Sequence, residues 1–110
     1  MAPEGFVRVG AAGDFVEGVI QSVAALDGEV AVVRWKDRFF AFGNRCTHMG
    51  MAMRWGYVTD ADEVVCPVHT AVYDLATGLA LDVPRYPFGG DLPVYAVQVE
   101  AGEVYVGHGP

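Results

Sequence analysis

Two short segments, Cys46-Thr47-His48 and Cys66-Pro67-Val68-His69, constrain the fold of this chain more than any other feature. They contain both of its cysteines and two of its three histidines. Thiolate and imidazole groups are ligands for soft and borderline transition metals. A fold that brings the two segments together therefore creates a site with two sulfur and two nitrogen ligands.

The spacing within each segment separates the possible kinds of site. Structural zinc sites commonly take ligands of one type, about two to four residues apart, from each knuckle. Here a single residue lies between Cys46 and His48, and each segment carries one ligand of each type. This arrangement suits a two-iron, two-sulfur cluster in which both cysteines bind one iron and both histidines bind the other. A zinc site stays open as an alternative, whereas a catalytic Cys-His pair would leave the duplicated pattern unexplained.

The composition indicates one small globular domain with a core of its own. The 110 residues are 53% hydrophobic and 19% charged, which excludes a disordered tail. No apolar run approaches the roughly 18 residues that cross a bilayer, and the N-terminal residues do not form a secretory signal. If both cysteines bind metal, none is left for a disulfide, so we expect a cytoplasmic location without membrane association. With 14 acidic residues against 7 basic ones, nucleic acid is not an expected partner.

Short apolar runs separated by turn residues predict an all-β domain. The expected strands are Phe6–Val9, Val19–Leu26, Glu29–Trp35, Arg38–Phe42, Tyr57–Val58, Glu63–Cys66, Val72–Asp74, Leu79–Leu81, Tyr95–Glu100 and Glu103–Val106. Asp27-Gly28, Lys36-Asp37 and Ala101-Gly102 are expected to form hairpin turns. Tyr95, Val97 and Val99 alternate with polar or small residues and are expected to share one face of their strand.

The two ligand segments resemble the cluster-binding loops of Rieske proteins, and the resemblance covers most of the chain, from about Phe6 to Val106. Within that superfamily the chain is most similar to the small soluble ferredoxins of bacterial multicomponent aromatic-ring oxygenases. The resemblance implies a single domain over residues 1–110, with an antiparallel β-sandwich base and a small cluster-binding subdomain inserted at about residues 42–78. It also implies one Rieske-type 2Fe-2S cluster per chain, with ligands Cys46, His48, Cys66 and His69.

The function implied by this resemblance is electron transfer. Ferredoxins of this kind carry single electrons from a ferredoxin reductase to a terminal oxygenase and catalyse no reaction of their own. We expect a monomer, because such a shuttle presents one face to two partners in turn. The membrane-bound relatives that oxidise quinols carry an extra cysteine in each loop. Met51 and Val68 stand at those places here, which argues against that branch.

Residues around the second loop depart from the ferredoxin pattern. Thr70 follows His69 where the family usually has glycine, so the backbone has less freedom there. Tyr73 stands where low-potential ferredoxins more often have phenylalanine. In higher-potential relatives this tyrosine donates a hydrogen bond toward a ligating sulfur, and a nearby serine donates a second; Ala71 occupies the serine position here. Packing of the Tyr73 ring against the loop is the alternative role.

The resemblance implies that the outer edges of His48 and His69 lie near the surface, where electrons enter and leave. We expect a docking rim around them, because methionine side chains adapt to varied surfaces; simple cover over the cluster is the alternative. The rim residues are Met49, Met51, Trp55 and the loop Pro84–Asp91. This loop belongs to the segment Pro84–Pro93, which holds three of the six prolines and is expected to lie on the surface.

Two other functions stay open. One is a small Rieske-like subunit of a nitrite reductase-type enzyme, although many such subunits have lost the ligands that are present here. The other is a zinc-stapled interaction module. His108 has no cysteine beside it and receives no role.

Overall fold

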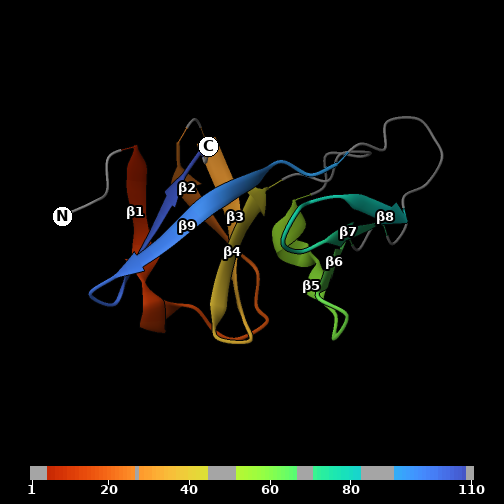
Figure 1. The fold of residues 1–110 in the computed structure, drawn as a ribbon, viewed down its shortest axis with the longest axis horizontal. Coiled ribbons are helices and arrows are strands. Elements are labelled where there is room, and N and C mark those ends of the chain that lie inside the picture. Colours follow the sequence, from red (N-terminus) through yellow and green to blue (C-terminus); the bar gives the residue numbers. More distant parts are fainter. Residues whose placement is uncertain (1–4, 27, 45–51, 67–70, 83–90, 109–110) are drawn as a thin grey trace.

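The computed structural model in Figure 1 describes residues 5–26, 28–44, 52–66, 71–82 and 91–108. In these ranges the chain forms ten strands and two short 3-10 helices, η1 (Ala12–Asp14) and η2 (Met53–Trp55). The strands are β1 (Phe6–Ala11), β2 (Gln21–Ala25), β3 (Gly28–Trp35), β4 (Arg38–Gly43), β5 (Tyr57–Val58), β6 (Glu63–Val65), β7 (Val72–Asp74), β8 (Ala80–Asp82), β9 (Val94–Glu100) and β10 (Glu103–Gly107). All strand pairs between these elements are antiparallel, so the prediction of an all-β antiparallel fold is confirmed.

The larger sheet has the strand order β1-β10-β9-β4-β3-β2 and forms the base of the molecule. β4 and β9 pair over a short stretch: Ala41 with Tyr95 and Phe42 with Val94, followed by a hydrogen bond from the Gly43 N–H to the carbonyl oxygen of Pro93 at 2.8 Å. The sheet is therefore two three-stranded halves joined at one corner, which is the arrangement of a sandwich. A buried core lies between the halves: Phe15, Ala25, Val30, Val32, Ala41, Val104 and Val106.

The smaller sheet has the strand order β5-β6-β7-β8 and lies beside the β4 side of the base (Figure 1). A second core connects the two sheets: Ile20, Ala31, Val33, Phe42, Met53, Val64, Cys66, Ala71, Tyr73, Leu75 and Leu92. β3 serves both cores because its side chains alternate: Val30 and Val32 face the base core, whereas Ala31 and Val33 face the second core. Full burial of side chains of this size stabilises the packing by roughly 1.5–3 kcal/mol each.

Two of the three predicted hairpin turns are confirmed. Lys36 and Asp37 have φ of 52° and 62°, and Ala101 and Gly102 have φ of 52° and 79°, as the tight turns of twisted hairpins require. The prediction of a turn at Asp27-Gly28 is wrong by one residue, because Gly28 pairs with Ala25 inside the ladder and Leu26 takes the positive φ of 56°. The alternation that buries both faces of β3 sets this register and overrides the preference of glycine for the turn.

Some strand limits also differ from the sequence expectation. For example, the strand expected at Val19–Leu26 spans only Gln21–Ala25 in the structure. Tyr95 and Val97, expected to share one face, both pack against the base core, whereas Val99 lies toward the outer end of β9 and is 47% exposed. The smaller sheet runs from Tyr57 to Asp82. The inserted subdomain at about residues 42–78 stays a prediction.

Candidate metal centre

The four predicted ligands divide between described and undescribed parts of the chain. Cys66 is described, whereas Cys46, His48 and His69 lie outside the described residues. Four further predicted residues, Thr70, Met49, Met51 and Pro84, also lie outside them. The structure therefore locates the site through Cys66, Tyr73, Trp55 and the residues that flank the two ligand segments.

Cys66 directly follows β6 and is completely buried in the core between the sheets. Its backbone N–H donates a hydrogen bond to the carbonyl oxygen of Ala71 at 2.8 Å. The next pair along the ladder is Val65 with Val72. The β6–β7 ladder thus continues to Cys66 and Ala71, the two residues on either side of 67–70.

The first ligand segment is bracketed in the same way. The backbone N–H of Met53 donates to the carbonyl oxygen of Asn44 at 2.6 Å, which joins the two ends of the stretch 45–52. The Asn44 side chain is 7% exposed, accepts a hydrogen bond from Ser22 Oγ at 2.6 Å and donates one to Glu29 Oε1 at 3.4 Å. These bonds fix the exit from β4 that leads to Cys46.

Gly56 packs the backbone that follows the first ligand segment against Val65, which directly precedes Cys66. Its N–H donates to the carbonyl oxygen of Met53 at 2.8 Å, and Tyr57, the next residue, pairs with Val65. A Cβ on Gly56 would overlap the carbonyl oxygen of Val65, the residue before Cys66. Glycine is therefore required where the first segment rejoins the smaller sheet.

Tyr73 lies in the centre of the same core and is completely buried. It is paired with Val64 on β6 and with Ala80 on β8. Tyr73 and Cys66 thus come from adjacent strands and share one buried cluster, as a role beside the ligand requires. The predicted hydrogen bond to a ligating sulfur stays a prediction, and so does the packing alternative.

Trp55 ends η2 and is 64% exposed. The guanidinium of Arg54 lies over its ring, with Cζ 5.1 Å from the ring centroid. Tyr57 is also exposed, at 52%. Aromatic residues and arginine are enriched at protein interfaces, so this surface stays a candidate for docking.

No group of three or more His, Cys, Asp or Glu side chains within the described ranges could hold a metal ion. Met53, Cys66 and Ala71 border the stretches that carry the other three predicted ligands, and all three belong to one buried core, which fits a centre with two sulfur and two nitrogen ligands.

The sequence pattern of the Rieske 2Fe-2S domain matches residues 5–96. The chain belongs to the Rieske 2Fe-2S domain family. This Rieske domain is 36% identical over 78 residues to the 3-phenylpropionate/cinnamic acid dioxygenase ferredoxin subunit of Photorhabdus laumondii, with 71% of each chain covered.

Solved structures agree with this family. The ferredoxin of carbazole 1,9a-dioxygenase from Nocardioides aromaticivorans IC177 matches with 30% identity and a TM-score of 0.82, over 94% of this chain and 98% of that chain. A chain in a complex of reduced oxygenase and oxidized ferredoxin in carbazole 1,9a-dioxygenase matches with 31% identity and a TM-score of 0.81, over 97% and 96%. The predicted resemblance to ferredoxins of ring-hydroxylating dioxygenases is confirmed.

The Rieske domain is also similar to a protein of another function. A Mycobacterium tuberculosis protein assigned as the small subunit of an NADH-dependent nitrite reductase matches with 29% identity and a TM-score of 0.80, over 92% of each chain. The fold alone therefore does not separate the two functions.

The sequence pattern assigned no role to Gly56 or Asn44. Gly56 could have been noticed as a glycine close behind a ligand segment, but its crowding against Val65 arises only in the fold. No helix in the described ranges combines the length and apolar character that a membrane span requires.

Proposed function

We propose that this Rieske protein is a ferredoxin that takes single electrons from a ferredoxin reductase and delivers them to a terminal oxygenase of the ring-hydroxylating type. The observation that carries the proposal is that both ligand segments are complete in sequence and are bracketed on one buried core. The names of the relatives support the oxygenase as partner. In this function the chain catalyses no reaction itself.

The residues that would hold the cluster are Cys46 and Cys66 on one iron and His48 and His69 on the other, with one 2Fe-2S cluster per chain. When bound, such a cluster accepts and releases one electron reversibly. Burial of Cys66 removes water from the sulfur side, which opposes the extra negative charge of the reduced state. Hydrogen bonds donated to the ligand sulfurs favour that charge, and this is the role that we propose for Tyr73. Thr70 would restrict the backbone directly after His69.

Docking is proposed at the rim of Met49, Met51, Trp55 and the Pro84–Asp91 loop. Exposure of Trp55 supports this surface. The last residue of the loop, Asp91, accepts a hydrogen bond from the backbone N–H of Ala80 at 2.8 Å, and this bond ties the loop end to β8. Trp and Arg residues often dominate the energy of an interface. We further propose that the protein works as a monomer in the cytoplasm.

The experiment that tests this function is reconstituted electron flow. The purified protein is mixed in aerated buffer with a ferredoxin reductase, NADH, a ring-hydroxylating oxygenase and the aromatic substrate of that oxygenase, and product formation is followed with and without the protein. We expect product only when all components are present. If the protein takes up no electrons from any chemical or enzymatic reductant, the electron-carrier function is refuted.

A nitrite reductase subunit is the second candidate, because the Mycobacterium tuberculosis protein has a similar fold over nearly the whole chain. A subunit of this type would stay bound to its large partner during purification. A ferredoxin must instead exchange between two partners during turnover. Purification of the untagged protein from its native cells by size exclusion separates the two: a small free species supports the ferredoxin.

A further inference from the structure

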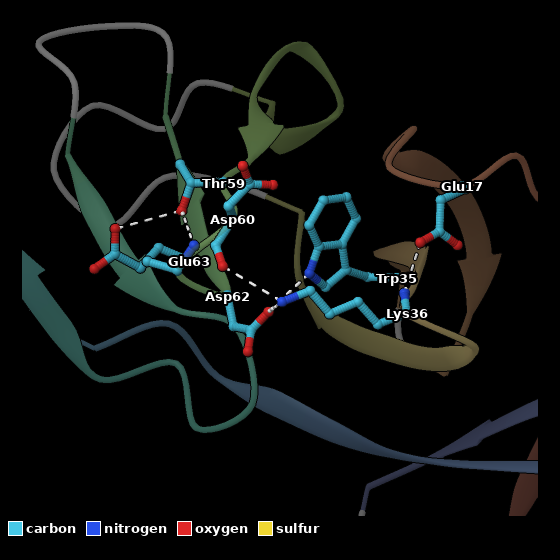
Figure 2. Close-up of polar contacts among 8 residues, drawn as sticks. Glu17, Trp35, Lys36, Thr59, Asp60, Asp62 and Glu63 are labelled. Carbon is cyan, nitrogen blue, oxygen red and sulfur yellow. Dashed lines mark hydrogen bonds and ion pairs between the residues drawn. The ribbon is translucent and has the colours of Figure 1, made fainter.

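A polar contact joins the two sheets at the end of the β3–β4 hairpin. Figure 2 shows the Asp62 carboxylate pointing toward Trp35 and Lys36. The Trp35 indole N–H donates to Asp62 Oδ1 at 2.8 Å, and Lys36 Nζ lies 2.9 Å from the same oxygen. Lys36 Nζ also donates to the carbonyl oxygen of Asp60 at 3.4 Å. We call Trp35, Lys36 and Asp62 the sheet clamp.

The base side of the sheet clamp is fixed by the segment before β2. The backbone N–H of Lys36 donates to Glu17 Oε2 at 2.7 Å, and the N–H of Gly18 donates to the carbonyl oxygen of Arg34 at 2.7 Å (the Glu17 contact is drawn in Figure 2). A Cβ on Gly18 would lie only 3.4 Å from the Trp35 ring. These contacts therefore position the Trp35 and Lys36 donors independently of Asp62.

The other side of the sheet clamp is fixed by the backbone of Asp62. Its N–H donates to the carbonyl oxygen of Thr59 at 3.0 Å, and its own carbonyl oxygen accepts from the N–H of Leu75 at 3.0 Å. Asp62 has a φ of 59°, a conformation that Asp, Asn and Gly adopt most readily. Asp62 precedes β6, which leads to Cys66, and Leu75 follows β7, which carries Tyr73.

The charge on Asp62 is favoured by its partners. The Lys36 ammonium and the Trp35 indole lower the pKa of Asp62, so it is ionised at neutral pH. The side chains of Lys36 and Asp62 are 54% and 57% exposed, and such an exposed ion pair alone contributes little stability. The clamp therefore depends on both donors to one fixed oxygen: the neutral indole N–H of Trp35 and the Lys36 ammonium.

We propose that Asp62 is a positioning residue for the cluster site, because its carboxylate fixes β6 and β7 on the base and thereby sets how tightly Cys66 and Tyr73 are enclosed. The buried core packs the two sheets against each other. The hydrogen bonds of the sheet clamp fix one end of the interface between them. This proposal rests on the proposed function, since the sheet clamp can affect the cluster only if Cys66 is one of its ligands.

Variants on opposite sides of the interface test the proposal. D62G removes the carboxylate and keeps the positive φ available, W35F removes one donor from the other sheet without a change of charge, and D60N is the matched control. D60N removes one negative charge from the same turn, but the Asp60 side chain has no contact in the clamp. The readouts are the hydrogen exchange rate of the Leu75 amide, iron content, and the midpoint potential of the holoprotein.

We expect D62G and W35F to speed exchange of the Leu75 amide by about tenfold, the effect of losing a hydrogen bond to a charged group. Both variants should keep their iron and raise the midpoint potential, because looser packing admits water that stabilises added negative charge. D62N, which keeps an acceptor oxygen for Trp35, should show a smaller change, and D60N should show none in exchange.

Equal exchange rates in D62G, W35F and D60N would overturn the proposal. A midpoint change in D62G that D60N reproduces would overturn it as well, because the effect would then be charge alone. If the wild-type protein contains no 2Fe-2S cluster, the proposed function fails instead. The exchange rates still report on the clamp in that case.

Discussion

Replacement of Gly56 by alanine should destabilise the protein and lower its cluster content. The added Cβ would overlap the carbonyl oxygen of Val65 and lie 3.2 Å from the carbonyl oxygen of Met53. Both are backbone atoms, so neither can rotate away, and the first ligand segment must move off β6. Extra atoms in packed regions cost about 1–3 kcal/mol, which for a domain of this size lowers Tm by roughly 4–20 °C.

The assay is thermal unfolding followed by circular dichroism, with iron per chain measured on the same sample. Gly28→Ala is the matched control, because nothing lies within 4 Å of the Cβ added there and Gly28 lies in strand β3. We expect the control to equal the wild type in both measurements. If G56A unfolds at the temperature of G28A with full iron, the crowding does not position the segments and the reasoning is refuted.

Three further predictions concern single groups. Tyr73→Phe should lower the midpoint potential within the range of about −150 to +300 mV found for centres of this kind, because a donor to sulfur is lost; an unchanged value in protein-film voltammetry would assign the ring to packing. The midpoint should fall as pH rises through alkaline values, since reduction strengthens proton binding at His48 and His69, and a flat profile would contradict exposed imidazole ligands. The clamp stabilises the fold fully above the unfolded pKa of Asp62, 3.8, and loses this effect as pH falls through the lowered folded value. The difference in unfolding free energy between wild type and Asp62→Asn, measured in urea, should therefore shrink as the pH falls below 3.8. A difference that does not change with pH would show that the ionised Asp62 carboxylate does not stabilise the fold.

Local patterns in the sequence predicted the strands and most turns well. Lys36-Asp37 and Ala101-Gly102 form the expected turns because each loop is short and its neighbours alternate regularly. The error at Gly28 has a non-local cause. The register there is set by the two cores that β3 serves, and a dipeptide preference carries no information about them.

The site was predictable only in its ligand types. Cys66 and Tyr73 could be chosen because their spacing resembles a known pattern, and both lie in the core between the sheets. Gly56 and Asp62 act through partners that are close only after folding: a carbonyl oxygen on β6 for Gly56, and an indole on the other sheet for Asp62. The sequence pattern assigned neither residue a role in positioning the site, because these partners come together only in the fold.

The central claim is that Cys46, His48, Cys66 and His69 together bind two irons. Its most direct test is elemental and acid-labile sulfide analysis of the anaerobically purified protein, with electron paramagnetic resonance of the reduced form. The account predicts two irons and two sulfides per chain and an average g value below that of clusters with four cysteine ligands. One zinc per chain with neither iron nor sulfide would contradict it.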